Sequence, residues 1–185
     1  FGGNTLYIGT GAGVFILQEK QGDETNASVV RLTRNFQTEE MLGDIRGSWS
    51  FDRATQVNDD SYKGNNLTNN GGVTFATDGV RGKAASFDGV DDYLSSSSTD
   101  FELAGDFSLG AWIKGSTWIG KRDAQSGGGN GYGIRCHSGV CYAYSNNKST
   151  SATLPADWNT VYYHVVQTHN ANGNIAIYIN GEKIS

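Results

Sequence analysis

Short hydrophobic runs recur along the whole chain, and polar or glycine-rich segments separate them. The clearest alternation puts Ile175, Ile177 and Ile179 on one face of a strand. Runs this short and frequent, with almost no helical periodicity, predict an all-β sandwich or barrel. The expected strands are Ser48–Phe51, Val73–Thr77, Ala84–Phe87, Tyr93–Ser95, Phe107–Lys114, Trp118–Lys121, Tyr132–Cys136, Cys141–Tyr144, Thr160–Thr168 and Ile175–Ile179.

The N-terminal part of the chain has its own pattern. Thr5–Gly9 and Gly13–Leu17 are rich in β-branched and aromatic residues, and a flexible segment joins them. This arrangement predicts a β-hairpin. Val29–Leu32 is a further candidate strand.

The composition supports a folded domain with an appendage. The chain has 185 residues, of which 11% are aromatic, and this is enough to build a core. Its 26 glycines and single proline suit tight turns between ladders that use every backbone N–H. Because the composition shifts at Gly47, we divide the chain into an N-terminal β segment, residues 1–46, and a domain, residues 47–185.

Charge and hydrophobicity argue against two classes of partner. The formal net charge is −5, from 14 Lys and Arg against 19 Asp and Glu, and no basic footprint for nucleic acid is present. No apolar run approaches the roughly 20 residues that span a bilayer, so we expect no membrane insertion. Because the chain begins with Phe1 and not with Met, we expect a processed product or a fragment.

The two cysteines predict a disulfide. Cys136 and Cys141 are separated by four residues and flanked by strand-like runs, so a four-residue hairpin loop would place them opposite each other. Cα atoms of such a pair lie about 4.5 Å apart, within the roughly 4.4–6.8 Å that disulfides tolerate. The alternative is two buried free thiols in a reducing compartment. A disulfide favours a secreted or cell-surface location.

Several motifs of residues 47–185 carry a family resemblance. They occur in the order found in LamG-like domains, which are concanavalin A-like lectin/glucanase jelly rolls, and the chain resembles this family over about three quarters of its length. The resemblance implies a jelly-roll β-sandwich, but it leaves function open, because this fold hosts both lectins and glycosidases. The motifs are Gly47–Asp52, Asp59–Thr68, Gly82–Leu94, Phe107–Lys114 and Ile177–Glu182.

The two ends of the chain depart from the family pattern. In the family, further strands follow the turn at Asn180-Gly181, whereas this sequence ends at Ser185. An Asn-Gly turn predicts a partner strand directly after it, and an unpaired edge would invite strand addition from another chain. Residues 1–46 resemble a β-propeller hairpin, and a donor strand or a linker are the alternatives.

Two acidic loops are candidates for Ca²⁺, which prefers several oxygen ligands. The resemblance implies a structural Ca²⁺ at the first loop, with Asp60 and Asn65 as ligands. Asp91 and Asp92, together with Asp88, form the second acidic loop. The alternative is Asx-turn chemistry, in which these side chains bond to their own backbone.

The sequence predicts no catalytic residue. A retaining glycosidase needs two carboxylates about 5–5.5 Å apart. The glucanases of this fold carry them in an E-x-D-x-x-E run, which is absent here, and Glu102 and Glu182 are isolated.

The aromatic residues divide into core and surface candidates. Trp49 and Trp112 lie inside strand patterns and are expected in the core. Trp118 and Trp158 lie nearer strand ends and are the better surface candidates, while the pair Tyr142/Tyr144 shares one strand face. These residues define no ligand-binding site from sequence alone.

We therefore expect a non-catalytic, extracellular binding or adhesion module that recognises glycans or another cell-surface ligand, with calcium dependence. Two alternatives stay open. One is a subunit of an extracellular filament that binds other copies of itself through strand exchange. The other is an accessory domain of a secreted glycoside hydrolase.

Overall fold

The computed structural model describes residues 5–10, 13–18, 45–52, 55–61, 63–76, 78–121 and 131–185. This part of the chain consists of antiparallel strands, turns and one short 3-10 helix, η2 (Thr99–Phe101). No helix in it is long and apolar enough to span a bilayer. The candidate strand Val29–Leu32 lies outside the described residues.

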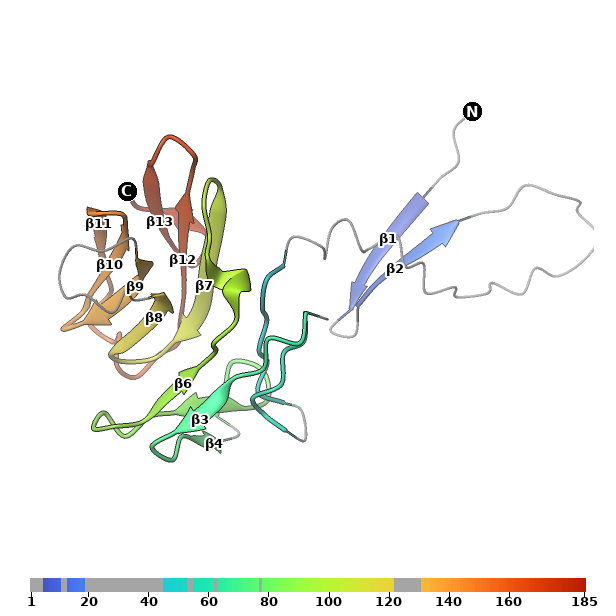
Figure 1. Cartoon of the computed structure of the whole chain (residues 1–185), viewed down its shortest axis with the longest axis horizontal. Helices are drawn as coiled ribbons and strands as arrows, with labels where there is room; N and C mark the ends of the chain where they lie inside the picture. Colours follow the sequence, from blue (N-terminus) through green and yellow to red (C-terminus); the bar gives the residue numbers. More distant parts are fainter. Residues whose placement is uncertain are drawn as a thin grey trace, which may run out of the picture.

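Two four-stranded sheets pack face to face (Figure 1) and confirm the predicted β-sandwich. Sheet I has the strand order β11-β10-β9-β8, and sheet II has the order β14-β13-β12-β7. The strands of sheet I are β8 (Thr117–Lys121), β9 (Tyr132–His137), β10 (Val140–Ser145) and β11 (Lys148–Thr153). Those of sheet II are β7 (Phe107–Ile113), β12 (Tyr163–His169), β13 (Ile175–Ile179) and β14 (Glu182–Lys183).

The core lies between the two sheets and follows the strand period of two. In β12 every second residue is buried, and in β13 both Ile177 and Ile179 are buried while Ile175 packs against the core. The predicted isoleucine face is therefore confirmed. The buried cluster consists of Ile113, Ile134, Cys136, Cys141, Ala143, Ala152, Leu154, Tyr163, Val165, Ile177 and Ile179.

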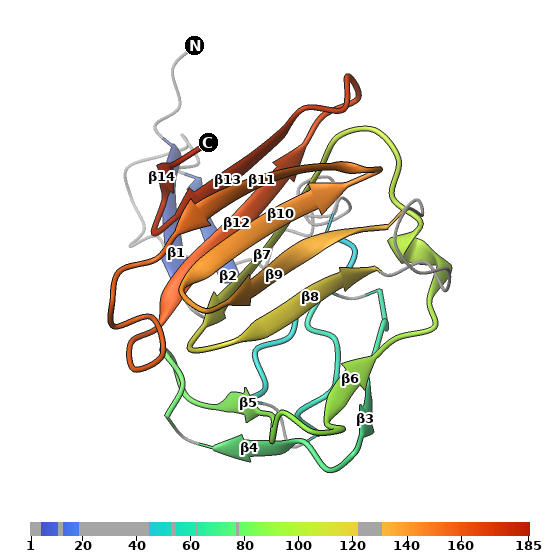
Figure 2. The same cartoon turned by 90° about the vertical axis from the view of Figure 1, so that its left-hand side faces the viewer.

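Two small sheets lie beside the sandwich (Figure 2). Three of their four strands fall within the predicted runs, whereas β3, like β11 of sheet I, was not predicted. The pairs are β3 (Thr68–Asn70) with β6 (Tyr93–Ser95) and β4 (Thr74–Ala76) with β5 (Ala84–Ser86).

The predicted strand Ser48–Phe51 is wrong, because this segment forms no strand ladder: the Asp60 N–H donates to the Ser48 carbonyl at 2.7 Å, and two carboxylates accept N–H groups of the segment. The Ser48 N–H donates to Oδ1 of Asp59 at 3.0 Å, and the Ser50 N–H donates to Oδ2 of Asp60 at 2.9 Å. Phe51 adopts φ 63°, which ends an extended conformation.

The N-terminal hairpin is confirmed. β1 (Thr5–Thr10) and β2 (Gly13–Gln18) pair antiparallel from Thr5↔Gln18 to Thr10↔Gly13. Among the described residues they form a separate two-stranded sheet.

The partner strand predicted after Asn180-Gly181 is also present, with only two residues. Both turn residues have positive φ, 51° and 86°, which matches the twist of a two-residue hairpin. β14 then pairs with β13, and Ile184 extends the ladder by donating its N–H to the Ile177 carbonyl at 2.9 Å. β14 is therefore one edge strand of sheet II, and β7 is the other.

The Cys136–Cys141 disulfide is present, but its hairpin is tighter than predicted. The strands continue one residue beyond each cysteine, and the turn consists of Ser138 and Gly139 alone, with φ 51° and 77°. The cysteines are directly paired, with Cα atoms 4.0 Å apart, and both are buried in the core. The disulfide therefore links the two strands at the centre of sheet I.

Replacing both cysteines (C136A/C141A) is expected to lower the free energy of unfolding by about 2 kcal/mol, because the short closed loop removes a limited amount of chain entropy. Urea unfolding measures this loss. As the control, a thiol reductant should destabilise the wild-type protein and leave the variant unchanged. Equal unfolding midpoints for the two proteins under oxidising conditions would contradict the prediction.

Candidate functional site

The first acidic loop is organised by Asp59, a residue that the sequence analysis did not select. Its buried carboxylate accepts the N–H groups of Ser48, Ser61 and Asn65 at 2.9–3.0 Å and the Ser61 hydroxyl at 2.7 Å. Burial raises the pKa of Asp59, but these hydrogen bonds outweigh it and hold the pKa below the ordinary value of 3.8. The ionised carboxylate is thus the centre on which the loop closes.

The side chains of the predicted ligands Asp60 and Asn65 both form hydrogen bonds with other parts of the protein near Asp59. Asp60 accepts the Ser50 N–H, and the buried Asn65 amide donates to the Arg46 carbonyl at 2.7 Å and to Asp100 at 2.9 Å. These contacts join segments 10 to 35 residues apart in the chain, so they are not the Asx turns that were the alternative to a metal site. Calcium binding at Asp60 and Asn65 stays a prediction.

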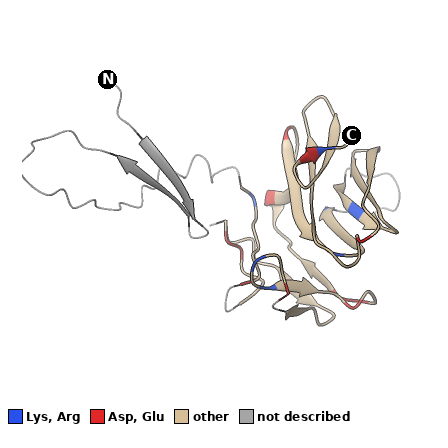
Figure 3. Cartoon of the chain, turned by 180° about the vertical axis from the view of Figure 1, so that it is seen from behind, with Lys and Arg blue, Asp and Glu red and all other residues tan. Residues whose placement is uncertain are grey.

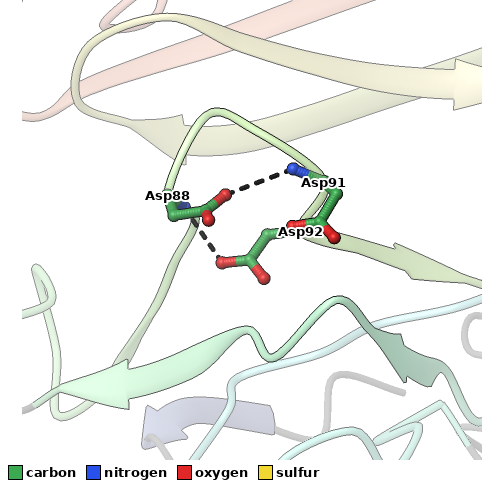
Figure 4. Close-up of side chains that lie close together, drawn as sticks. All are labelled: Asp88, Asp91 and Asp92. Atoms are coloured by element: carbon green, nitrogen blue, oxygen red, sulfur yellow. Dashed lines mark hydrogen bonds between the residues drawn. The ribbon is translucent and has the colours of Figure 1, made fainter.

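The second acidic loop brings three carboxylates together (Figure 4). One oxygen from each of Asp88, Asp91 and Asp92 lies within 4.8 Å of the others, the only such group of three metal-ligating side chains in the described part of the chain. Asp92 accepts the Asp88 N–H at 2.9 Å, and Asp88 accepts the Val90 N–H at 2.8 Å. The bond from Val90 outweighs desolvation and lowers the pKa of Asp88.

A row of exposed side chains crosses the outer face of sheet I. The strand register pairs Trp118 with Arg135, Arg135 with Tyr142, and Tyr142 with Ser151. Because facing residues of neighbouring strands point to the same side of a sheet, all four side chains lie on the face opposite the core. Trp118 is 45% exposed, Tyr142 is 38% exposed, and Arg135 is also exposed. We call these four residues the Arg135 row, and Figure 2 shows sheet I from this side.

Neighbouring rings hold the two aromatic residues of the row in place. Trp118 donates its indole N–H to the Tyr144 hydroxyl, and the His137 ring stacks on Tyr142 with centroids 5.4 Å apart. Tyr144 lies so close over Gly133 that a Cβ there would come within 2.8 Å of the hydroxyl oxygen. The glycine therefore allows the phenol to lie against the sheet beside Trp118.

The tryptophans are distributed differently from the prediction. Trp118 is confirmed on the surface, but Trp158 is partly buried against the core. Trp112 is 52% exposed and not in the core, because its position in β7 alternates with the buried Ile113. It lies on the outer face of sheet II beside His164, with ring centroids 5.0 Å apart. The predicted shared face of Tyr142 and Tyr144 is confirmed by the register of β9 and β10.

Sequence reasoning found two members of the row, Trp118 and Tyr142, but missed Arg135. The signal lay in the hairpin: Arg135 precedes Cys136 and Tyr142 follows Cys141, so pairing the cysteines also pairs these two residues. Trp118 could not be aligned with them from sequence, because ten residues separate the end of β8 at Lys121 from the start of β9 at Tyr132, and no short turn sets the register of these two strands.

Comparison with known families identifies the sandwich region. The laminin G-type family model described as the concanavalin A-like lectin/glucanases superfamily matches residues 88–185. The match begins at Asp88 and includes both sheets and the Arg135 row. No curated protein and no solved structure matches the chain.

The Asp59→Asn variant is expected to lower the free energy of unfolding by about 2 kcal/mol, because three backbone donors lose a charged acceptor. Since the folded-state pKa of Asp59 is below 3.8, this contribution is complete above the unfolded-state pKa and is lost as pH falls through the folded-state pKa. Urea unfolding at about pH 7 and about pH 2.5 measures the difference in free energy of unfolding between wild type and variant.

This difference should narrow at the lower pH. Asp78→Asn is the control, because the exposed Asp78 pairs with Lys114 on the surface and its removal should change stability little. If the difference in free energy of unfolding between wild type and Asp59→Asn were the same at both pH values, the charge of Asp59 would not be what stabilises the loop.

Proposed function

Because the chain belongs to the concanavalin A-like lectin/glucanase superfamily, we propose that it is a non-catalytic glycan-binding module that acts outside the cell. The family supports a carbohydrate- or ligand-binding module in general. The observation that supports a specific binding surface is the Arg135 row, where two exposed aromatic rings flank a guanidinium group.

The chemistry of the row suits a sugar. The C–H faces of a pyranose pack on the π-faces of Trp and Tyr. Its hydroxyl groups accept hydrogen bonds from Arg, and they can donate to or accept from Tyr and His. Trp118 and Tyr142 lie on strands two spacings apart, roughly 9–10 Å, a span that a disaccharide bridges. Rings held by Tyr144 and His137 lose little freedom when they bind, which favours affinity.

The residue content of sheet I supports a non-catalytic role. Its four strands contain no Asp and no Glu, whereas glycosidases of either stereochemical class need a pair of carboxylates at the scissile bond. A sugar on the Arg135 row would therefore contact donors and aromatic rings but no strand carboxylate that could act as acid or nucleophile.

The disulfide supports the extracellular location, because such bonds persist in oxidising compartments. Domains of this family are usually extracellular as well.

We also propose that calcium binds at Asp88, Asp91 and Asp92, because three oxygens that converge within 4.8 Å match the ligand preference of this ion. Calcium should then raise the thermal unfolding midpoint of the wild-type protein above its value in EDTA. At a calcium concentration of a hundred times Kd, the free energy of unfolding should rise by about 2.7 kcal/mol. D91N/D92N should abolish the rise, and D60N should retain it. Loss in D60N alone would place the ion at the first loop, and no rise in the wild type would contradict calcium binding.

Trp118→Ala and Tyr142→Ala should each weaken glycan binding by more than about fivefold, the effect of losing about 1 kcal/mol of stacking. A glycan array identifies a ligand, and calorimetry then compares the variants. Trp112→Ala is the matched control, because it removes an equally exposed tryptophan from the outer face of sheet II. Loss of binding in W112A with retention in W118A would contradict the proposed surface, and absence of binding to any glycan would contradict the function.

A further inference from the structure

Resting on the proposed glycan-binding function, we infer that the Arg135 row selects acidic glycans. In this arrangement the Arg135 guanidinium binds the carboxylate of a uronic acid while the sugar ring packs on Trp118 or Tyr142. The inference depends on three features: the single positive charge on the outer face of sheet I, the absence of a competing partner for Arg135 among the described residues, and the planar geometry of its side chain.

The outer face of sheet I carries one charged strand residue, and it is basic although the protein is acidic. The chain has a net charge of −5, but the strands β8 to β11 contain no Asp and no Glu (Figure 3). Of their three basic residues only Arg135 lies on the outer face, because Lys121 and Lys148 pair into the row of the buried Tyr132 and Ser145. An anionic ligand on the Arg135 row therefore meets the positive charge of Arg135 and no strand carboxylate.

Arg135 differs from the two lysines of its sheet, because within the described part of the chain its side chain has no ion-pair or hydrogen-bond partner. Lys121 forms an ion pair with Glu102, and Lys148 donates to the Gly173 carbonyl at 3.0 Å; both line a cavity at one end of the sandwich. Among the described residues, no carboxylate pairs with Arg135, and no hydrogen bond of its side chain is found. Its donors therefore stay available to a ligand.

The side-chain geometry of Arg135 favours a carboxylate over a neutral hydroxymethyl group. A guanidinium presents parallel N–H donors that match both oxygens of a carboxylate, and such charge-assisted pairs are about twice as strong as neutral hydrogen bonds. The flanking rings of Trp118 and Tyr142 remove water from both sides of this pair when a sugar covers them. Arg135 is thus placed to distinguish a uronic acid from the corresponding neutral hexose.

The test compares each acidic oligosaccharide with its own neutral form. Oligomers of galacturonate, of mannuronate and of hyaluronan, each beside its carboxyl-reduced counterpart, are titrated into the wild-type protein by calorimetry. At least one acidic oligomer should bind about ten- to a hundredfold more tightly than its neutral form. Neutral oligomers that bind as tightly as the acidic ones would overturn the inference and leave the proposed function standing. A lack of binding to every oligomer here and every glycan on the array would overturn both.

Variants of Arg135 test whether this residue carries the preference. Arg135→Gln should remove it, so that acidic and neutral oligomers bind equally, while Arg135→Lys should keep part of it, because the charge remains but the planar fork does not. Arg81→Gln, at another exposed arginine, is the control and should bind like the wild type. Thermal unfolding checks that each variant is folded. An acidic preference that survives in R135Q would overturn the role of Arg135.

Discussion

The direct pairing of Cys136 with Cys141 is the constraint on which the proposed binding surface depends. Because strand side chains alternate between two faces, a register that turns both cysteines into the core necessarily turns Arg135 and Tyr142 outward and opposite each other. A slip of one residue would bury the guanidinium and expose the disulfide. The two-residue turn at Ser138-Gly139 and the covalent bond both oppose that slip, so one hairpin determines the core on one side and the binding row on the other.

The two outer faces of the sandwich differ in the charge that lies beside their exposed tryptophans. Sheet II also exposes a tryptophan, Trp112, beside His164, but the nearby Lys114 is neutralised by Asp78. In sheet I, Arg135 has no such counter-charge among the described residues. Both sheets therefore expose a tryptophan beside a basic side chain, but only in sheet I is that side chain without a counter-charge among the described residues. This difference favours an anionic sugar on sheet I.

The sequence predicted those features that local patterns determine. Alternation predicted the Ile175–Ile179 face, and cysteine spacing predicted the disulfide, because both depend on residues close together in the chain. It missed β11, whose residues Lys148–Thr153 are polar, although the preceding Asn146 and Asn147, both at positive φ, form the turn that leads into it. It misplaced Trp112, which alternates with the buried Ile113, and it did not select Asp59, whose hydrogen bonds reach segments distant in the chain. The filament and accessory-domain hypotheses stay predictions.

The most direct test of the central claim is a nuclear magnetic resonance titration that follows the indole N–H signals of the tryptophans while the tightest-binding acidic oligosaccharide is added. Binding on the Arg135 row should shift the Trp118 indole signal, since a sugar there disturbs its hydrogen bond to Tyr144, together with the backbone amides of Arg135 and Tyr142. The Trp112 indole on sheet II should stay in place. Shifts confined to Trp112, or to residues outside sheet I, would contradict the account.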